Sequence, residues 1–263
     1  MPSKRLLEKG STPLSMRLHF LNCFTCNARV PSSWHTGTLC LLAETAQGPV
    51  LIDTGPGLDD YLHPPIILRV FQVITKVPMD ADEAAVRQVA RLGYNPEDVR
   101  HVVLTHMHFD HCGGLGDFPR ATVHVHQREY EAFMGRPRRV SDLAYVRRHI
   151  AHRPQFALYG DRGESWYGLP AILLPFQPEM WLVPLHGHTR GHCGVAIRTG
   201  VGWHFHVADA GPVALEDYAP AWLVNFALGP HTDRLRAFAA AHPEVRITTG
   251  HMWLDFFDGR ESI

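Results

Sequence analysis

The sequence lacks several features that would mark a specialised class of protein. It has five cysteines, an odd number that argues against a disulfide framework and favours reduced thiols. Residues 1–16 contain no apolar core of a secretory signal. The most apolar stretch outside the expected strands, residues 64–78, carries Arg69 and Lys76 and is shorter than the roughly 18 residues of a spanning helix. We therefore expect a cytoplasmic protein that does not enter a membrane.

An excess of charge of one sign is also absent. The chain has 25 Lys and Arg against 26 Asp and Glu, which gives a formal net charge of -1. Such a balance provides no overall field to attract a polyanion, so we expect neither nucleic acid nor an anionic membrane as partner. Histidine, in contrast, is abundant, with 19 residues. Because histidine is the commonest metal-ligating side chain, this number calls for a chemical explanation.

The pattern of apolar residues predicts a layered α/β fold. A length of 263 residues that are 45% hydrophobic suits one domain, which we assign to residues 1–263. Short apolar runs bounded by Gly, Pro, Asp or Thr predict strands at 39–43, 50–52, 102–104, 121–125, 182–185, 195–197, 205–208 and 245–247. Helices are predicted at 84–92, after a capping-box pattern of Asp80 and Glu83, and at 232–241. Interleaved strands and helices place the sheet at the centre.

Residues 135–178 differ from the rest of the chain. They contain six arginines in the part up to residue 153, several prolines and six aromatic residues. Such a long, irregular insertion favours a lid or a pocket wall over a part of the sheet core. The alternative is a segment that packs on the surface or at a subunit contact.

The segment that carries chemistry is His106-Met-His108-Phe-Asp110-His111, directly after the predicted strand at 102–104. Four potential ligands within six residues would have to be desolvated together, and metal coordination makes that favourable. His106 and His108 have the spacing to face one ion, and Asp110 and His111 can face a second. The sequence therefore predicts a metal centre here.

Further motifs follow or precede this one in a fixed order. They are Leu51-Ile-Asp53-Thr-Gly55, His186-Gly-His188-Thr-Arg-Gly-His192, Ala208-Asp209 and Thr249-Gly250-His251. Together with the central histidine motif they resemble the signature of the metallo-β-lactamase superfamily, over roughly residues 39–251. Five ordered elements make a chance match improbable.

The resemblance implies a four-layer αββα sandwich with two mixed sheets at its centre, and a dinuclear metal site. One ion would be held by His106, His108 and His188, the other by Asp110, His111 and His251, with Asp209 bridging them. Two zinc ions suit these donors, although other divalent transition metals, iron included, do so too. A hydroxide bridging the ions would be the nucleophile. Asp110 could pass a proton to the leaving group, Asp53 could contact a ligand histidine, and His192 would make a structural hydrogen bond.

The spacing of the motifs resembles that of the N-acyl homoserine lactonase and methyl parathion hydrolase group. Asp209 follows His188 by 21 residues (209 minus 188), and His251 follows Asp209 by 42 (251 minus 209). The resemblance implies a hydrolase of an ester or lactone bond in a small molecule with an apolar acyl or aryl part. The apolar residues 65–77 and the insertion would line its pocket. The lactonases carry a tyrosine three residues after the bridging aspartate, whereas this chain has Pro212 there, with Tyr218 nearby.

Other functions remain open on the same scaffold. A phosphotriester or thioester hydrolase would use the same site, and a persulfide dioxygenase-like oxidoreductase would hold one iron on His106, His188 and Asp209. A ligand-binding protein without catalysis, and a homodimer, are also open. Paired histidines on strands, His124 with His126 and His204 with His206, favour hydrogen-bonded core residues or exposed sheet residues over further ligands. Cys23 and Cys26 form a C-x-x-C for which packing is the favoured role.

Overall fold

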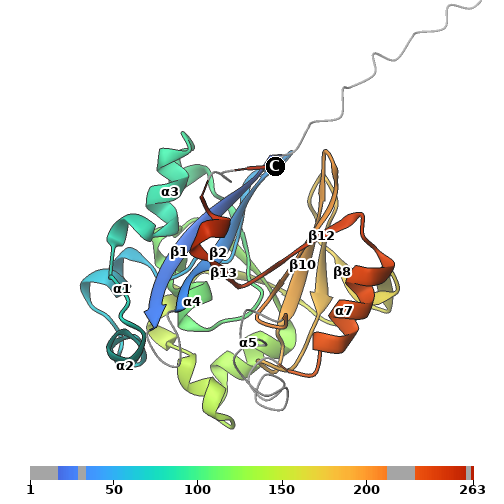
Figure 1. Ribbon diagram of the computed structural model, residues 1–263. Coiled ribbons are helices and arrows are strands. Elements are labelled where there is room, and N and C mark those ends of the chain that lie inside the picture. The colour runs from blue at the N-terminus through green and yellow to red at the C-terminus, as the bar shows by residue number, and fades with distance from the viewer. Residues whose placement is uncertain (1–16, 29–33, 212–228, 259–261) are drawn as a thin grey trace, which may run out of the picture.

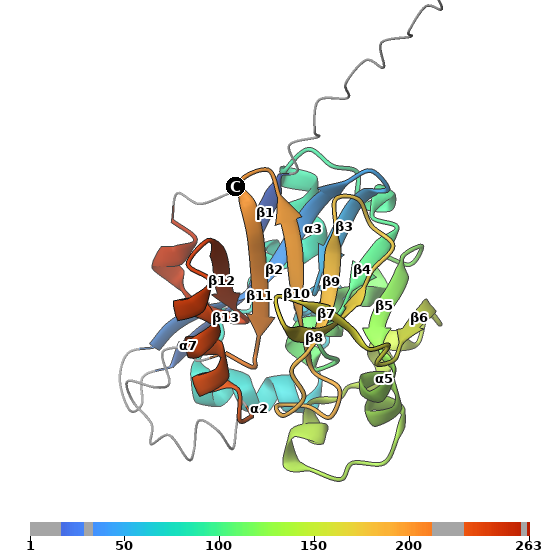
Figure 2. The ribbon, with the colours of Figure 1, turned by 90° about the vertical axis from the view of Figure 1, so that its right-hand side faces the viewer.

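The computed structural model describes residues 17–28, 34–211, 229–258 and 262–263. In this part of the chain two β-sheets pack face to face, and helices cover the outer side of each (Figures 1 and 2). α1 (Leu58–Leu62), α2 (Ile66–Thr75) and α3 (Ala85–Arg91) lie outside the first sheet, and α7 (Thr232–Ala241) lies outside the second (Figure 1). The predicted four-layer αββα sandwich is therefore confirmed.

Each sheet mixes parallel and antiparallel pairs. The first runs β1 (Leu18–Ala28), β2 (Trp34–Thr45), β3 (Gly48–Ile52), β4 (His101–Val103), β5 (Thr122–His126) and β6 (Gln155–Tyr159), with β13 (His251–Trp253) paired to β2. The second runs β12 (Val245–Thr249), β11 (Gly202–Ala208), β10 (Cys193–Thr199), β9 (Met180–Pro184), β8 (Leu169–Leu173) and β7 (Glu164–Trp166). β3 to β6 pair in parallel, as do β11 and β12, so the carboxyl ends of these strands meet at common edges.

Four apolar clusters lie in the described part of the chain, and three of them join the layers. Between the sheets, side chains such as Ile52 and Val103 pack with Leu182 and Val195. A second cluster joins the outer face of the first sheet to α3, and a third joins the second sheet to α7 through Leu235 and Phe238. Burial of apolar surface at about 25 cal/mol per Å² makes these layers the main stabilising term. The rigid sandwich leaves the loops at the strand ends free to carry polar side chains.

The predicted elements match the structure closely in most places. Six of the eight apolar runs coincide with strands to within two residues, whereas β2 begins five residues before the run at 39–43 and β11 three residues before the run at 205–208. The helix at 232–241 is confirmed. The capping box was wrong in detail, because Asp80 caps a short 3-10 helix by accepting a hydrogen bond from Asp82 N, whereas Glu83 accepts two from Thr25. Helix α3 begins afterwards, at Ala85.

The prediction for residues 135–178 needs correction. Its second half enters the sheets, as β6 at the edge of the first and as β7 and β8 in the second. Only the first half, with the 3-10 helices 140–144 and 147–150, lies outside the sheets, after α5 (Gln127–Met134). Among the described residues, no helix is long and apolar enough to cross a membrane.

Candidate metal centre

The motif residues lie on loops that leave the ends of strands. Asp53 follows β3, and the histidine motif follows β4 and enters α4 (Phe109–Cys112). His188 lies between β9 and β10, Asp209 directly after β11, and His251 at the start of β13. The two sheets therefore each contribute part of the centre, and a side chain from one sheet meets a side chain from the other.

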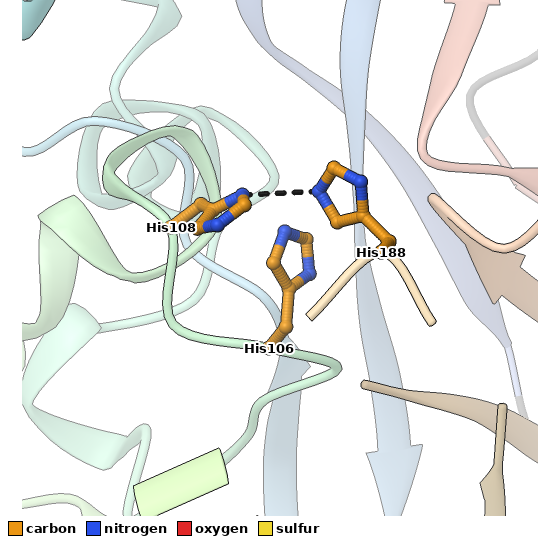
Figure 3. Close-up of side chains that lie close together, drawn as sticks. All are labelled: His106, His108 and His188. Carbon is orange, nitrogen blue, oxygen red and sulfur yellow. Dashed lines mark hydrogen bonds between the residues drawn. The ribbon is translucent and has the colours of Figure 1, made fainter. Parts of the chain in front are cut away.

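The first group consists of His106, His108 and His188. Their nitrogen atoms lie within 4.8 Å of one another, and His108 Nδ1 is 3.0 Å from His188 Nε2 (Figure 3). Burial, with the neighbouring histidines, lowers the pKa of His106 and of His108 well below the ordinary value. Both rings are therefore neutral near pH 7, which is the state that binds a metal.

The second group consists of Asp110, His111 and His251. Asp110 Oδ2 is 3.6 Å from His251 Nε2 and 3.9 Å from His111 Nε2. Although burial alone would lower the pKa of His251, the carboxylates of Asp209 and Asp110 outweigh it and raise that pKa. This group thus has the mixed carboxylate and imidazole chemistry that the first group lacks.

The Asp209 carboxylate lies between the two groups. Its Oδ2 is 3.4 Å from His188 Nε2 and 3.5 Å from His251 Nε2, and its Oδ1 is 3.5 Å from His111 Nε2. Burial raises the pKa of Asp209, but His251 and His111 outweigh this effect and hold it well below its ordinary value. Asp209 is therefore an anion that faces both groups.

The donor atoms fit divalent metal ions. Among the residues that the structure describes, the buried Nε2 atoms of His106 and His111 find no hydrogen-bond partner, a cost that an ion would remove. Two donors bound to one tetrahedral ion at about 2.0–2.1 Å lie about 3.3 Å apart. The separations of 3.0 to 3.9 Å between the donors here are close to this value.

Asp53 and His192 lie directly behind the two groups. Asp53 Oδ2 accepts hydrogen bonds from His111 Nδ1 at 2.8 Å and from Thr105 Oγ1 at 2.7 Å. Thr105 Oγ1 is in turn 3.1 Å from His106 Nδ1, so one carboxylate supports a histidine of each group. His192 Nε2 accepts the N–H of Asp209 at 3.1 Å, which fixes the backbone of Asp209.

Two residues that support the metal groups, Thr105 and Glu129, were not predicted from the sequence. Thr105 could have been singled out, because it precedes His106 directly at the end of the predicted strand. Glu129 is completely buried and hydrogen-bonded to both histidine loops, yet it lies on α5 among exposed polar residues. Burial raises its pKa, in spite of hydrogen bonds that act in the opposite sense. No local pattern distinguishes it from the exposed Glu131.

The histidines that were paired on strands find hydrogen-bond partners. His124 Nδ1 lies 2.8 Å from Tyr159 OH, and His204 and His206 both approach Thr248 Oγ1. A further group, His126 with Asp161 and His186, has donor atoms within 4.8 Å. His126 Nδ1 accepts the N–H of Arg128 at 3.2 Å, which leaves the ring proton on Nε2, 3.3 Å from Asp161 Oδ1. This hydrogen bond pairs His126 with Asp161, and His186 Nδ1 donates to His192 O at 3.1 Å.

Four further residues were singled out in the sequence, namely two cysteines, a proline and a tyrosine. Cys23 and Cys26 are buried free thiols within β1, in agreement with packing as their role. Pro212 and Tyr218 lie outside the described residues.

Comparisons with known proteins show the family of the chain. The sequence pattern of the Metallo-beta-lactamase superfamily matches residues 35–251, a range that contains every motif of the centre. A Mycobacterium tuberculosis protein named "Probable metallo-hydrolase" is 41% identical over 199 residues, which are 74% of this chain and 62% of that protein. This chain therefore spans less than two thirds of that relative. An N-acyl homoserine lactonase of a Bacillus species is 34% identical over 222 residues, which are 80% of this chain and 78% of the lactonase.

A solved structure supports the fold. It is an N-acyl homoserine lactone hydrolase with the product N-hexanoyl-L-homoserine at its catalytic metal center. The likeness has a TM-score of 0.68 at 23% identity and covers 94% of this chain and 98% of the other. On the sequence match over residues 35–251, the chain belongs to the metallo-beta-lactamase superfamily.

Proposed function

We propose that the protein is a dinuclear zinc hydrolase that cleaves an ester or lactone bond of a small molecule. The observation that carries this proposal is the Asp209 carboxylate, whose oxygens lie within 3.5 Å of nitrogen atoms from both histidine groups. Imidazole and carboxylate donors suit zinc, and other divalent metals including iron fit them too. Two such ions, when bound, acidify a shared water and polarise the scissile carbonyl.

The residues around the ions would transfer a proton and hold the ligands in position. Asp110 is buried, with 9% of its surface exposed, and its Oδ2 faces His251 and His111. We assign it the transfer of a proton to the leaving alkoxide. Asp53 and His192 would keep the histidines and Asp209 in place through the hydrogen bonds described above. A site held in this way needs little rearrangement during the reaction.

The apolar part of the substrate would lie against α2. The ring of Phe71 on this helix meets the ring of Phe109, between His108 and Asp110, edge to face at 5.9 Å. Phe71 is 37% exposed, and Ile66 and Val70 are more exposed still. Ala144 and Val146 pack in the same cluster as Leu68 of α2, which places the first half of residues 135–178 beside this surface. We propose that this half forms a pocket wall for an acyl or aryl group.

One experiment tests the proposal directly. The purified protein is analysed for bound metal and then assayed, with zinc, on a panel of lactones, aryl esters, thioesters and phosphotriesters. Two metal equivalents and hydrolysis of a lactone or ester are expected. One iron with oxygen consumption would instead identify an oxidoreductase, and two ions without hydrolysis would favour a ligand-binding protein. A cytoplasmic location is proposed as well, since all five cysteines are buried thiols.

A further inference from the structure

The Glu129 carboxylate holds together two loops that carry metal-binding histidines. Glu129 Oε1 accepts the N–H of Met107, which lies between His106 and His108, at 2.9 Å. Glu129 Oε2 accepts hydrogen bonds from Thr189 Oγ1 at 2.7 Å and from Gly191 N at 3.0 Å, directly after His188. One buried side chain therefore links the loops that supply the first group.

The loop after His188 rests on the first turn of α5. A Cβ atom at Gly191 would lie 2.1 Å from Glu129 N, so only glycine permits this approach. Arg190 Nη2 donates to Ala132 O at 3.1 Å further along the same helix. Backbone atoms make most of the contacts between this loop and α5. The Glu129 carboxylate is the side chain that also hydrogen-bonds the other loop, and it therefore fixes one loop relative to the other.

Glu129 also reaches His108 through Tyr145. Tyr145 OH donates to Glu129 Oε1 at 2.9 Å, and the Tyr145 ring lies 5.3 Å from the His108 ring. His108 Nε2 is buried without a hydrogen-bond partner among the described residues, whereas Nδ1 faces His188 Nε2. The orientation of the His108 ring therefore depends on packing against Tyr145, which Glu129 holds.

We propose that Glu129 is a positioning residue for the metal group His106, His108 and His188. It sets the distance between the two loops and the orientation of the His108 ring, and so raises the affinity for metal without touching the ion. The inference rests on the proposed function only in that this group binds a metal.

The test compares Glu129→Gln with Glu131→Gln, which changes an exposed carboxylate of the same helix. Glutamine keeps the size of Glu129 but places an NH₂ group against N–H and O–H donors. Both variants and the wild type are titrated with Co²⁺, whose absorption spectrum reports the ligand geometry, and with Zn²⁺ against a chelator. We expect Glu129→Gln to bind one of the two ions about 10- to 100-fold more weakly, with an altered Co²⁺ spectrum. Glu131→Gln should match the wild type.

Unfolding of the metal-free proteins measures their stability independently of metal binding. A merely structural role of Glu129 would change this stability and leave the metal affinity and the Co²⁺ spectrum unchanged. If Glu129→Gln folds and binds both ions with wild-type affinity and spectrum, the inference is overturned, whatever happens to its stability. If Glu129→Gln does not fold, Tyr145→Phe replaces it as the test, because it removes one of the four donors and keeps the ring. A smaller loss of affinity in the same direction is then expected, and wild-type affinity would overturn the inference.

The hydrolase activity and the role of Glu129 can be contradicted separately. A wild-type protein that binds two ions but hydrolyses nothing on the panel contradicts the hydrolase, and the affinity of Glu129→Gln still decides the role of Glu129. A wild-type protein that binds no divalent ion overturns both.

Discussion

The Asp53 carboxylate accepts a hydrogen bond from His111 Nδ1 at 2.8 Å, and this contact selects the nitrogen of His111 that faces the metal centre. With the proton on Nδ1, the lone pair of Nε2 is directed at the centre, 3.5 Å from Asp209 Oδ1. Burial alone would lower the pKa of His111, but the carboxylates of Asp209, Asp110 and Asp53 outweigh it and raise that pKa well above its ordinary value. Metal binding at this histidine therefore requires the displacement of a proton from Nε2.

Asp53→Asn should weaken metal binding while the backbone is kept. Asp53 has a φ of +56°, a conformation that asparagine tolerates better than most residues. The carboxylate accepts from Thr105 N at one oxygen and from His111 Nδ1 and Thr105 Oγ1 at the other, whereas the amide must turn its NH₂ group towards donors on one of these two sides. We therefore expect about 10- to 100-fold lower affinity for zinc. Competition with a chelator measures it. Asp59→Asn, at an exposed carboxylate, is the control, and equal affinities of the two variants would contradict the role of Asp53.

The sequence was sufficient to predict the fold class and the residues that meet at the centre. The full ligand set came from the resemblance of the motifs to the family. The structure brings these residues together because they lie at or next to the ends of strands, such as Asp209 after β11, and strand ends meet at the edge of a sheet. The apolar runs did not predict β1 or β13, and they also missed β6 to β8, which lie at the far ends of the two sheets. Their short, partly exposed strands show no clear alternation, and β8 contains Pro170.

The role of Glu129 could not be predicted from the sequence for a different reason. Its partners Met107 and Thr189 lie 22 and 60 residues away along the chain. Such contacts depend on how the loops pack, which no periodicity reports.

Loss of a residue of the centre should abolish hydrolysis, whereas loss of a remote thiol should not. Asp110→Asn removes the proposed proton donor, for which we expect a kcat about 10²- to 10⁴-fold lower. His188→Ala removes a proposed metal ligand. We expect it to lower kcat by more than the roughly 100-fold loss that follows from substitution of a residue behind a ligand. Cys23→Ser places a hydroxyl in the core, so it should lower the free energy of unfolding by about 1–3 kcal/mol and leave kcat/KM nearly unchanged. A Cys23→Ser variant as inactive as the others would overturn the assignment of the site.

Phe71→Ala should reduce the preference for long acyl chains. The ring lies beside Phe109 and is partly exposed, so it offers apolar surface next to the centre. Each methylene that loses this contact costs up to about 0.8 kcal/mol. We therefore expect kcat/KM to fall for long-chain lactones and to change little for short ones. Val201→Ala, at an exposed valine of the turn between β10 and β11, is the control, and parallel changes for all chain lengths would exclude Phe71 from the substrate pocket.

Acid should destabilise the protein through its buried histidines. Burial, followed by the neighbouring His101, lowers the pKa of His124 from 6.5 to about 4. The folded protein therefore holds His124 neutral where the unfolded chain binds a proton, and the stabilisation present above pH 6.5 is lost as the pH falls toward 4. In this window one such histidine changes the free energy of unfolding by about 1.4 kcal/mol per pH unit. Urea unfolding of the metal-free protein should show a smaller slope for His124→Gln, whereas an unchanged slope, equal to that of the exposed-site control His63→Gln, would contradict it.

Gly250→Ala should disturb both metal ions through one carboxylate. A Cβ atom at this position would lie 2.1 Å from Asp209 Oδ1 and 3.1 Å from the carbonyl carbon of Ala208, so the added methyl group must displace Asp209. Because Asp209 faces both histidine groups, we expect weaker binding of both ions, together with a loss of about 1–3 kcal/mol in stability from overpacking. Gly116→Ala is the matched control, since its nearest neighbour, His152 Nδ1, is 4.0 Å away. Metal titration followed by unfolding in chelator separates the two effects. If Gly250→Ala retains two ions at wild-type affinity, Asp209 is not the residue that the two ions share.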